Sequence, residues 1–267
     1  MTALPGTMVL VDGSEHIESL RHQGLLLAAA ASAAGLSAPV PSCPEWDVRD
    51  LVRHVGGVHR WATGIVSAPG ADLKGADLDE VVGTWPDDPD LLAWFGDGHA
   101  QLVSALAGAD PDLECWTFLP APSPLAMWSR RQAHETAMHR VDAELAAGVS
   151  SVSCPPELAV DGIDELLTCF VPRPRTRLRA DPPRTLRVRC VDMAASWVVE
   201  ISPDGVKTSV SDGEGDAGRE SDADCEVSGA ASDLYLALWN RRDLSGLVVR
   251  GDAAVLGNFR EFVHVRW

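Results

Sequence analysis

The residues with the most potential for chemistry lie between positions 130 and 139, which read RRQAHETAMH. Histidine and glutamate are the side chains that most often bind zinc or transfer protons. A zinc protease would need two histidines four residues apart, as in the HExxH motif. His134 and His139 are five apart, so on a helix they diverge by roughly 140°, whereas Glu135 and His139 diverge by only about 40°. Glu135 and His139 are therefore the pair that can act together.

A third candidate, His54, lies in a predicted amphipathic helix at residues 48–66. It shares a face with Leu51 and Val58, so we expect it to point inward, where an imidazole needs a polar partner. With Glu135 and His139 it would offer a divalent metal, best Zn²⁺, two nitrogens and a carboxylate. Such a set leaves one position open, as in catalytic zinc sites. The alternative is that His54 bonds a backbone carbonyl and that Glu135 and His139 form an ordinary surface pair.

The helices that must position these residues follow from apolar residues at helical spacing. Asp47 is a predicted N-cap with Asp50 at the third helical position, and Gly35 and Gly148 are predicted stops. Two connections between the helices are long. The pattern predicts an up-and-down four-helix bundle with helices at residues 14–35, 48–66, about 90–107, and 124–147.

The composition changes at residues 150–156, which predicts a domain boundary and divides the chain into 1–150 and 151–267. One more helix is predicted at 157–170. Alternating and β-branched residues then predict a small antiparallel sheet. Ser232 is a predicted N-cap of a short helix that ends at Asn240, and Asp252 of a last helix. The predicted strands lie at 186–191, 197–201, 206–210 and 225–227, and the fold class is α plus α+β.

The chain has 267 residues, of which 39 are acidic and 22 basic, so its formal net charge is −17. This charge argues against nucleic acid and anionic membranes as partners. There is no apolar stretch of about 18 residues that could span a bilayer. The six cysteines have no metal-binding or disulfide spacing, which fits a reducing, cytoplasmic compartment and provides no obvious protein nucleophile.

Arginines are candidate anchors for an anionic substrate or another polar ligand. Arg241 and Arg242 follow an amphipathic segment, and Arg250 precedes a Gly-Asp pair, so either group could reach a cleft between the domains. The alternative is that they balance nearby acids. A larger arginine cluster is expected to pair with the acid-rich segment 211–226 in preference to binding a ligand. That cluster comprises Arg173, Arg175, Arg177, Arg179, Arg184, Arg187 and Arg189.

Two long motifs resemble a known family. Residues 40–62, VPSCPEWDVRDLVRHVGGVHRWA, look like the amino-terminal signature of the mycothiol-dependent maleylpyruvate isomerase family, actinobacterial proteins with a DinB-like metal-binding bundle. Residues 131–144 look like its second signature. Shorter similarities at 161–165 and 249–252 extend the resemblance over nearly the whole chain.

The resemblance implies a four-helix bundle that binds one divalent metal, usually zinc, through His54, Glu135 and His139. His134 would then lie behind the ligands or at the surface. It also implies a sterol-carrier-like C-terminal domain. The expected protein is a cytoplasmic monomer or small homo-oligomer.

The implied activity depends on an imported thiol, mycothiol, for which Arg241, Arg242 and Arg250 are also candidate anchors. A metal-bound thiol is deprotonated at neutral pH and can add to a small electrophile, as in an isomerase of the maleylpyruvate type or an S-transferase. The alternative is a non-catalytic module that binds a metal or an apolar ligand.

Overall fold

A computed structural model of the chain describes residues 11–68, 70–211 and 222–265. The chain divides into two compact units, residues 12–152 and the residues from 153 onward, and each unit is described by itself. Within the described ranges, no helix combines the length and the apolar character needed to cross a membrane. The class, α plus α+β, is the one that the sequence predicts.

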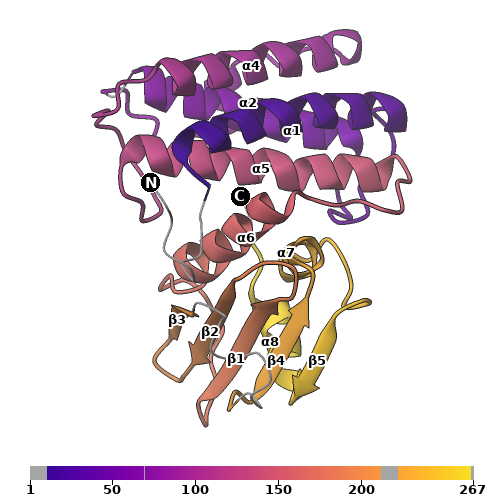
Figure 1. The fold of residues 1–267 in the computed structure, drawn as a ribbon. Helices are drawn as coiled ribbons and strands as arrows, with labels where there is room; N and C mark the ends of the chain where they lie inside the picture. The colour runs from indigo at the N-terminus through magenta and orange to yellow at the C-terminus, as the bar shows by residue number, and fades with distance from the viewer. Residues whose placement is uncertain (1–10, 69, 212–221, 266–267) are drawn as a thin grey trace. The chain divides into compact units, whose positions relative to one another are not determined.

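The first unit is built on the four predicted helices, which Figure 1 shows running alongside one another. Asp47 caps its helix with a capping box, because its side chain accepts from the Asp50 N–H while the Asp50 side chain accepts from the Asp47 N–H. A short helix that the sequence pattern does not predict, α3 (Leu78–Val82), lies in the connection between α2 and α4. The long helices are α1 (Gly13–Ala34), α2 (Val48–Ser67), α4 (Asp88–Gly108) and α5 (Pro124–Ala146).

The helices are not arranged as a simple up-and-down bundle, so this prediction is wrong. Helix α1 packs mainly on α5 and α4, and α2 packs on the same two helices, whereas α1 and α2 barely touch. Helices consecutive in the chain therefore lie diagonally opposite in two cases, α1 with α2 and α4 with α5. The connections 35–47 and 109–123 are long enough to cross the end of the bundle.

Helix α5 is enclosed on all sides over much of its length, because every residue from 131 to 143 is buried. Burial on all faces is unusual for a helix that carries so many polar side chains, since each needs a partner. The partners come from neighbouring helices and from α5 itself. The apolar part of the bundle core includes Leu27, Val48, Leu51, Val55, Leu91 and Phe95.

The second unit begins with α6 (Pro156–Asp164), which continues as a π-helical segment, η1 (Glu165–Phe170). One helix was predicted over this range. A five-stranded sheet follows in the order β3-β2-β1-β4-β5 (Figure 1). The strands are β1 (Arg184–Cys190), β2 (Ser196–Ile201), β3 (Val206–Ser211), β4 (Cys225–Gly229) and β5 (Val248–Gly251).

The sheet is mixed, which corrects the predicted antiparallel sheet. Strands β1, β2 and β3 form an antiparallel meander, but β4 pairs with β1 in parallel, with Val188 opposite Val227. The chain leaves β3 at one edge and returns on the other side of β1, so the direction of β4 depends on a connection and not on the local pattern. Strand β5, which was not predicted, pairs antiparallel with β4.

Two helices complete the second unit. Helix α7 (Ala231–Leu238) begins one residue before Ser232, so Ser232 is not its N-cap; its hydroxyl accepts from the Cys154 N–H instead. Asp252 does cap α8 (Ala253–Phe262), as predicted. The core of the unit contains Leu186, Val188, Trp197, Val199, Val227, Tyr235 and Phe259, all fully buried. All six cysteines of the chain are free.

Candidate metal centre

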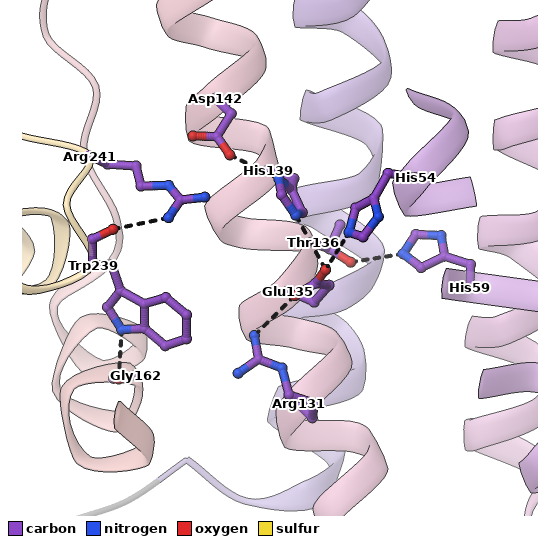
Figure 2. A network of polar contacts seen from close by, with 10 residues as sticks. All are labelled: His54, His59, Arg131, Glu135, Thr136, His139, Asp142, Gly162, Trp239 and Arg241. Carbon is purple, nitrogen blue, oxygen red and sulfur yellow. Dashed lines mark hydrogen bonds and ion pairs between the residues drawn. The ribbon is translucent and has the colours of Figure 1, made fainter. Parts of the chain in front are cut away.

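Helices α2 and α5 bring His54, Glu135 and His139 together inside the bundle (Figure 2). Nε2 of His54 and Nε2 of His139 each lie 3.2 Å from Oε1 of Glu135. The three candidate ligand atoms all lie within 4.8 Å of one another. Ligands of a tetrahedral zinc ion are separated by about 3.4 Å, since each Zn–ligand bond is near 2.1 Å. The donor set, two imidazoles and a carboxylate at this spacing, fits a divalent metal.

The orientation of His139 supports this fit. Its Nδ1 lies 2.8 Å from Oδ2 of Asp142, one helical turn further along α5, so a proton on Nδ1 is donated to that carboxylate. The hydroxyl of Ser42 donates to the other oxygen of Asp142 at 2.5 Å. With Nδ1 occupied, Nε2 is the nitrogen that faces the cluster. Carboxylates hold metal-binding histidines in this way.

Charges inside the cluster favour an ionised Glu135. Burial opposes ionisation, but the neighbouring His139, its hydrogen bond, the hydrogen bond from His54 and the Arg131 charge hold the pKa of Glu135 well below its usual range. Arg131 Nη2 lies 3.4 Å from Oε2 of Glu135. The Glu135 side chain is therefore an ionised carboxylate, which can bind a cation.

The pKa values of His54 and His139 are shifted in opposite directions. Burial would lower the pKa of His139, yet the Glu135 and Asp142 carboxylates outweigh it and raise that pKa to about 9. Burial lowers the pKa of His54 below its usual value, despite its hydrogen bond to Glu135. A metal ion must displace the proton of His139 to bind there, so binding releases a proton.

Two further side chains complete the surroundings. The indole of Trp46 lies against both imidazoles, with ring centroids 4.9 Å from His54 and 6.0 Å from His139. Thr136, next to Glu135, is held by a 2.9 Å hydrogen bond between its Oγ1 and Nε2 of His59 (Figure 2). These contacts leave little freedom for the ligand-bearing turn of α5.

His134 is fully buried, and its ring meets that of His16 edge to face at 6.0 Å. Of the two expectations for His134, the surface position is therefore wrong, and a position behind the ligands stays a prediction. The surface-pair alternative for Glu135 and His139 is also wrong, because their side chains are only 2% and 3% exposed.

The three arginines proposed as anchors lie in the second unit, where two have partners that the structure shows. Nη1 of Arg241 donates to the Trp239 carbonyl, while the Trp239 indole donates to the Gly162 carbonyl (Figure 2). Arg242 forms an ion pair with Asp233. This pair agrees with the alternative that the arginines balance nearby acids.

Arg250 is exposed on β5, opposite Glu226 of β4 in the strand register. A role of these arginines in holding substrate or thiol stays a prediction.

Sequence reasoning missed Asp142, Ser42 and Trp46. Asp142 follows His139 by three residues, a helical spacing that could have identified it. Ser42 and Trp46 lie in the loop before α2, where no periodicity indicates which way a side chain points.

The fold and the donor set together define a class of protein. It is a helical bundle in which side chains on two neighbouring helices could bind a metal ion, followed by a small α+β domain. The family model for the N-terminal domain of mycothiol maleylpyruvate isomerase matches residues 17–144, and the model for the C-terminal domain of that family matches residues 157–258. The chain therefore belongs to the mycothiol maleylpyruvate isomerase family.

Solved structures agree on the fold. The chain is similar to the crystal structure of the mycothiol-dependent maleylpyruvate isomerase, with a TM-score of 0.61 and 12% identity over 90% of this chain and 93% of that one. It is also similar to the structure of a histidine-to-alanine mutant of that isomerase, with a TM-score of 0.63 and 11% identity over the same shares. No curated protein matches the chain significantly in sequence.

Proposed function

We propose that this protein is a metal-dependent enzyme that uses a low-molecular-weight thiol, mycothiol, to attack a small electrophile. The observation that carries the proposal is the buried cluster of His54, Glu135 and His139, with its ligand atoms within 4.8 Å. Family membership supports mycothiol as the thiol. Two imidazoles and one carboxylate are a common donor set of catalytic zinc sites, and Zn²⁺ is the ion we propose.

When bound, the metal supplies a lowered thiol pKa, so that thiolate is available at neutral pH. The protein's own residues orient the candidate ligands and supply the charge at the metal site. Asp142 keeps the Nδ1 proton of His139 and thereby leaves Nε2 to face the cluster. Glu135 contributes the negative charge that offsets a cation, and the indole of Trp46 packs against the two imidazoles. The thiol enters from outside, because none of the cluster residues His54, Glu135 and His139 is a cysteine.

The reaction class follows from the nucleophile. A thiolate adds to the end of a conjugated C=C–C=O system, so that a C–S bond forms and the electron pair moves to the carbonyl oxygen. The former double bond can then rotate. Loss of the thiolate restores the double bond in the other geometry, which is isomerisation. Protonation of the α carbon instead leaves a thioether, which is S-transfer.

Metal analysis tests the site directly. We expect about one equivalent of zinc in the purified protein and its loss in His54→Ala and in His139→Ala. His22→Ala, which removes an exposed histidine of α1, is the matched control and should keep the metal. Tightly held metal in both cluster variants would contradict the ligand assignment.

A thiol assay separates the enzyme from a non-catalytic module. The zinc-loaded protein is incubated with mycothiol and a panel of conjugated electrophiles, and products are followed by mass spectrometry. We expect either isomers of unchanged mass or adducts heavier by one mycothiol, and neither with His139→Ala. If no thiol changes any electrophile, the chain is a binding module and the enzymatic proposal fails.

A further inference from the structure

The second unit contains a pocket of about 480 Å³ that the metal cluster does not use. It is formed by the segment that follows η1 and by the end of α8 and the residues after it. Its volume lies within the range of small-molecule sites. One part of the lining is apolar and includes Phe170, Val171, Phe262 and Val263.

The other part of the lining is cationic. Arg173, Arg175 and Arg177 contribute three guanidinium groups, whereas Glu261 is the one carboxylate among the described lining residues. In a protein with a net charge of −17, such a local excess of positive charge is unexpected. The arginines of β1 behave as predicted, since Arg184 and Arg189 face Asp224 and Glu226; residues 212–221 of the acid-rich segment lie outside the described residues.

The backbone holds the arginine segment in a fixed turn. The Arg173 N–H donates to the Phe170 carbonyl at 3.3 Å, and the Thr176 N–H donates to the Arg173 carbonyl at 2.9 Å. The Thr176 hydroxyl also donates to the Phe170 carbonyl. Pro172 and Pro174 flank Arg173 and restrict the backbone further. The backbone of this segment is therefore already ordered in the free protein, so that ligand binding loses little backbone entropy.

Arg173 carries the strongest indication of a ligand. Its Nη1 is buried and has no hydrogen-bond partner among the residues that the structure describes. Its guanidinium lies 5.6 Å from the centre of the Phe170 ring. A buried, unpaired guanidinium N–H is costly, and an anion is the partner that satisfies it best.

We propose that this pocket binds a small amphiphilic anion, an organic carboxylate or phosphate ester whose charged group pairs with Arg173, Arg175 and Arg177 and whose apolar body lies on Phe170 and Phe262. Phe262 is 44% exposed, so it offers apolar surface that a ligand can cover. The burial of Arg173 and the nearby Arg175 charge also lower the pKa of Arg173, which an anion would reverse.

Titration calorimetry of the full-length protein with four probes tests both halves of the proposal. Octanoate and octyl phosphate carry an anion and an apolar chain; octanol lacks the charge, and inorganic phosphate lacks the chain. We expect at least one amphiphilic anion to bind about tenfold tighter than octanol and inorganic phosphate. The stronger of the two identifies the headgroup. Equal affinity for octanol, or no binding of either anion, overturns the proposal.

Variants locate the binding. Arg173→Gln is expected to weaken the better probe about tenfold or more, because a charge-assisted hydrogen bond is lost. Glu261→Gln should tighten it, since a like charge beside the anion is removed. Arg21→Gln, the same charge change on α1, should have no effect. An unchanged affinity in both pocket variants contradicts the assignment even if one variant folds poorly.

This inference does not depend on the proposed function. The pocket residues all belong to the second unit and none is a candidate metal ligand. His54→Ala should therefore lose the metal and keep the affinity for the anion, while Arg173→Gln should keep the metal. Failure of one proposal thus leaves the other testable.

Discussion

Asp142 is the residue whose role in the cluster is most specific, because it contacts a candidate ligand without being one. It is fully buried and receives hydrogen bonds from Nδ1 of His139 and from the Ser42 hydroxyl. Asp142→Asn keeps the size but removes the charge that orients the ring. We expect the zinc affinity to fall about 10- to 100-fold, as for other outer partners of metal ligands.

A competition assay with a chelator measures this affinity. Asp97→Asn, an exposed aspartate on α4, is the charge-matched control and should leave it unchanged. Equal affinities for the Asp142 variant and the wild type would mean that Asp142 does not support the metal.

The buried residues His59 and His99 should make the free energy of unfolding decrease as the pH falls. Burial and the charge of His99 hold the pKa of His59 well below its usual value of about 6.5, and burial lowers the pKa of His99. Below pH 6.5 the unfolded chain binds protons that the folded protein does not, so the free energy of unfolding decreases with falling pH. His59 alone should contribute about 1.4 kcal/mol per pH unit.

Urea unfolding between pH 6.5 and 5.0, with a chelator present, measures this dependence; above pH 6.5 the raised pKa of His139 acts in the opposite direction. His99→Gln keeps a donor for the Leu20 carbonyl, which accepts from His99 at 3.0 Å, and should flatten the slope. A slope that is the same in the variant would show that His99 does not titrate as described.

The sequence predicts which three side chains come together, but not the residues that support them. His54, Glu135 and His139 are recognisable because helical periodicity says which side chains share a face. His59 depends on how α2 and α5 meet, whereas Ser42 and Trp46 depend on the loop before α2. None of these arrangements has a local period, so only the structure reveals them.

At the scale of elements, close helix packing predicts opposite effects of two glycine substitutions. A Cβ at Gly56 of α2 would lie 2.2 Å from Cζ3 of Trp94, which is held by Arg60 at 3.6 Å from its ring. Gly56→Ala should therefore destabilise the protein by about 1–2 kcal/mol, even though alanine favours the helix.

Gly96 of α4 is the matched control, because a Cβ there would meet nothing within 4 Å. Gly96→Ala should stabilise by about 0.5–1 kcal/mol. Denaturant unfolding measures both free energies. A Gly56→Ala variant as stable as Gly96→Ala would show that α2 and α4 can move apart.

The elements that the sequence predicts are those with local signals. The capping box of α2, the Asp252 cap of α8 and the alternation of buried residues in β1 are visible in a few consecutive residues. The bundle order, the parallel pairing of β4 with β1 and the added strand β5 are not. They depend on which distant segments meet, and loop lengths limit such choices without deciding them.

At the scale of the whole molecule, metal binding should couple to stability. An ion that binds the folded bundle and not the unfolded chain stabilises it in proportion to RT ln(1 + [L]/Kd), about 4 kcal/mol at a thousandfold excess over Kd. We expect a chelator to lower the unfolding temperature of the wild type by several degrees. His54→Ala should show no response to the chelator, and a response equal to that of the wild type would contradict the coupling.

The net charge of the chain hides an uneven distribution of charged side chains. A net charge of −17 suggested only that polyanions are poor partners. The structure shows that this charge is unevenly distributed, with Arg173, Arg175 and Arg177 gathered at one pocket. None of the six free cysteines belongs to the cluster of His54, Glu135 and His139.

The most direct test of the central claim is a spectrum of the cobalt-substituted protein during titration with mycothiol. Cobalt(II) reports its ligands in its absorption, and the proposed site has no protein sulfur. The account predicts a new thiolate-to-cobalt charge-transfer band that saturates at one mycothiol per metal and is absent in His139→Ala. A cobalt spectrum that does not change with mycothiol would contradict the claim that this site binds the thiol.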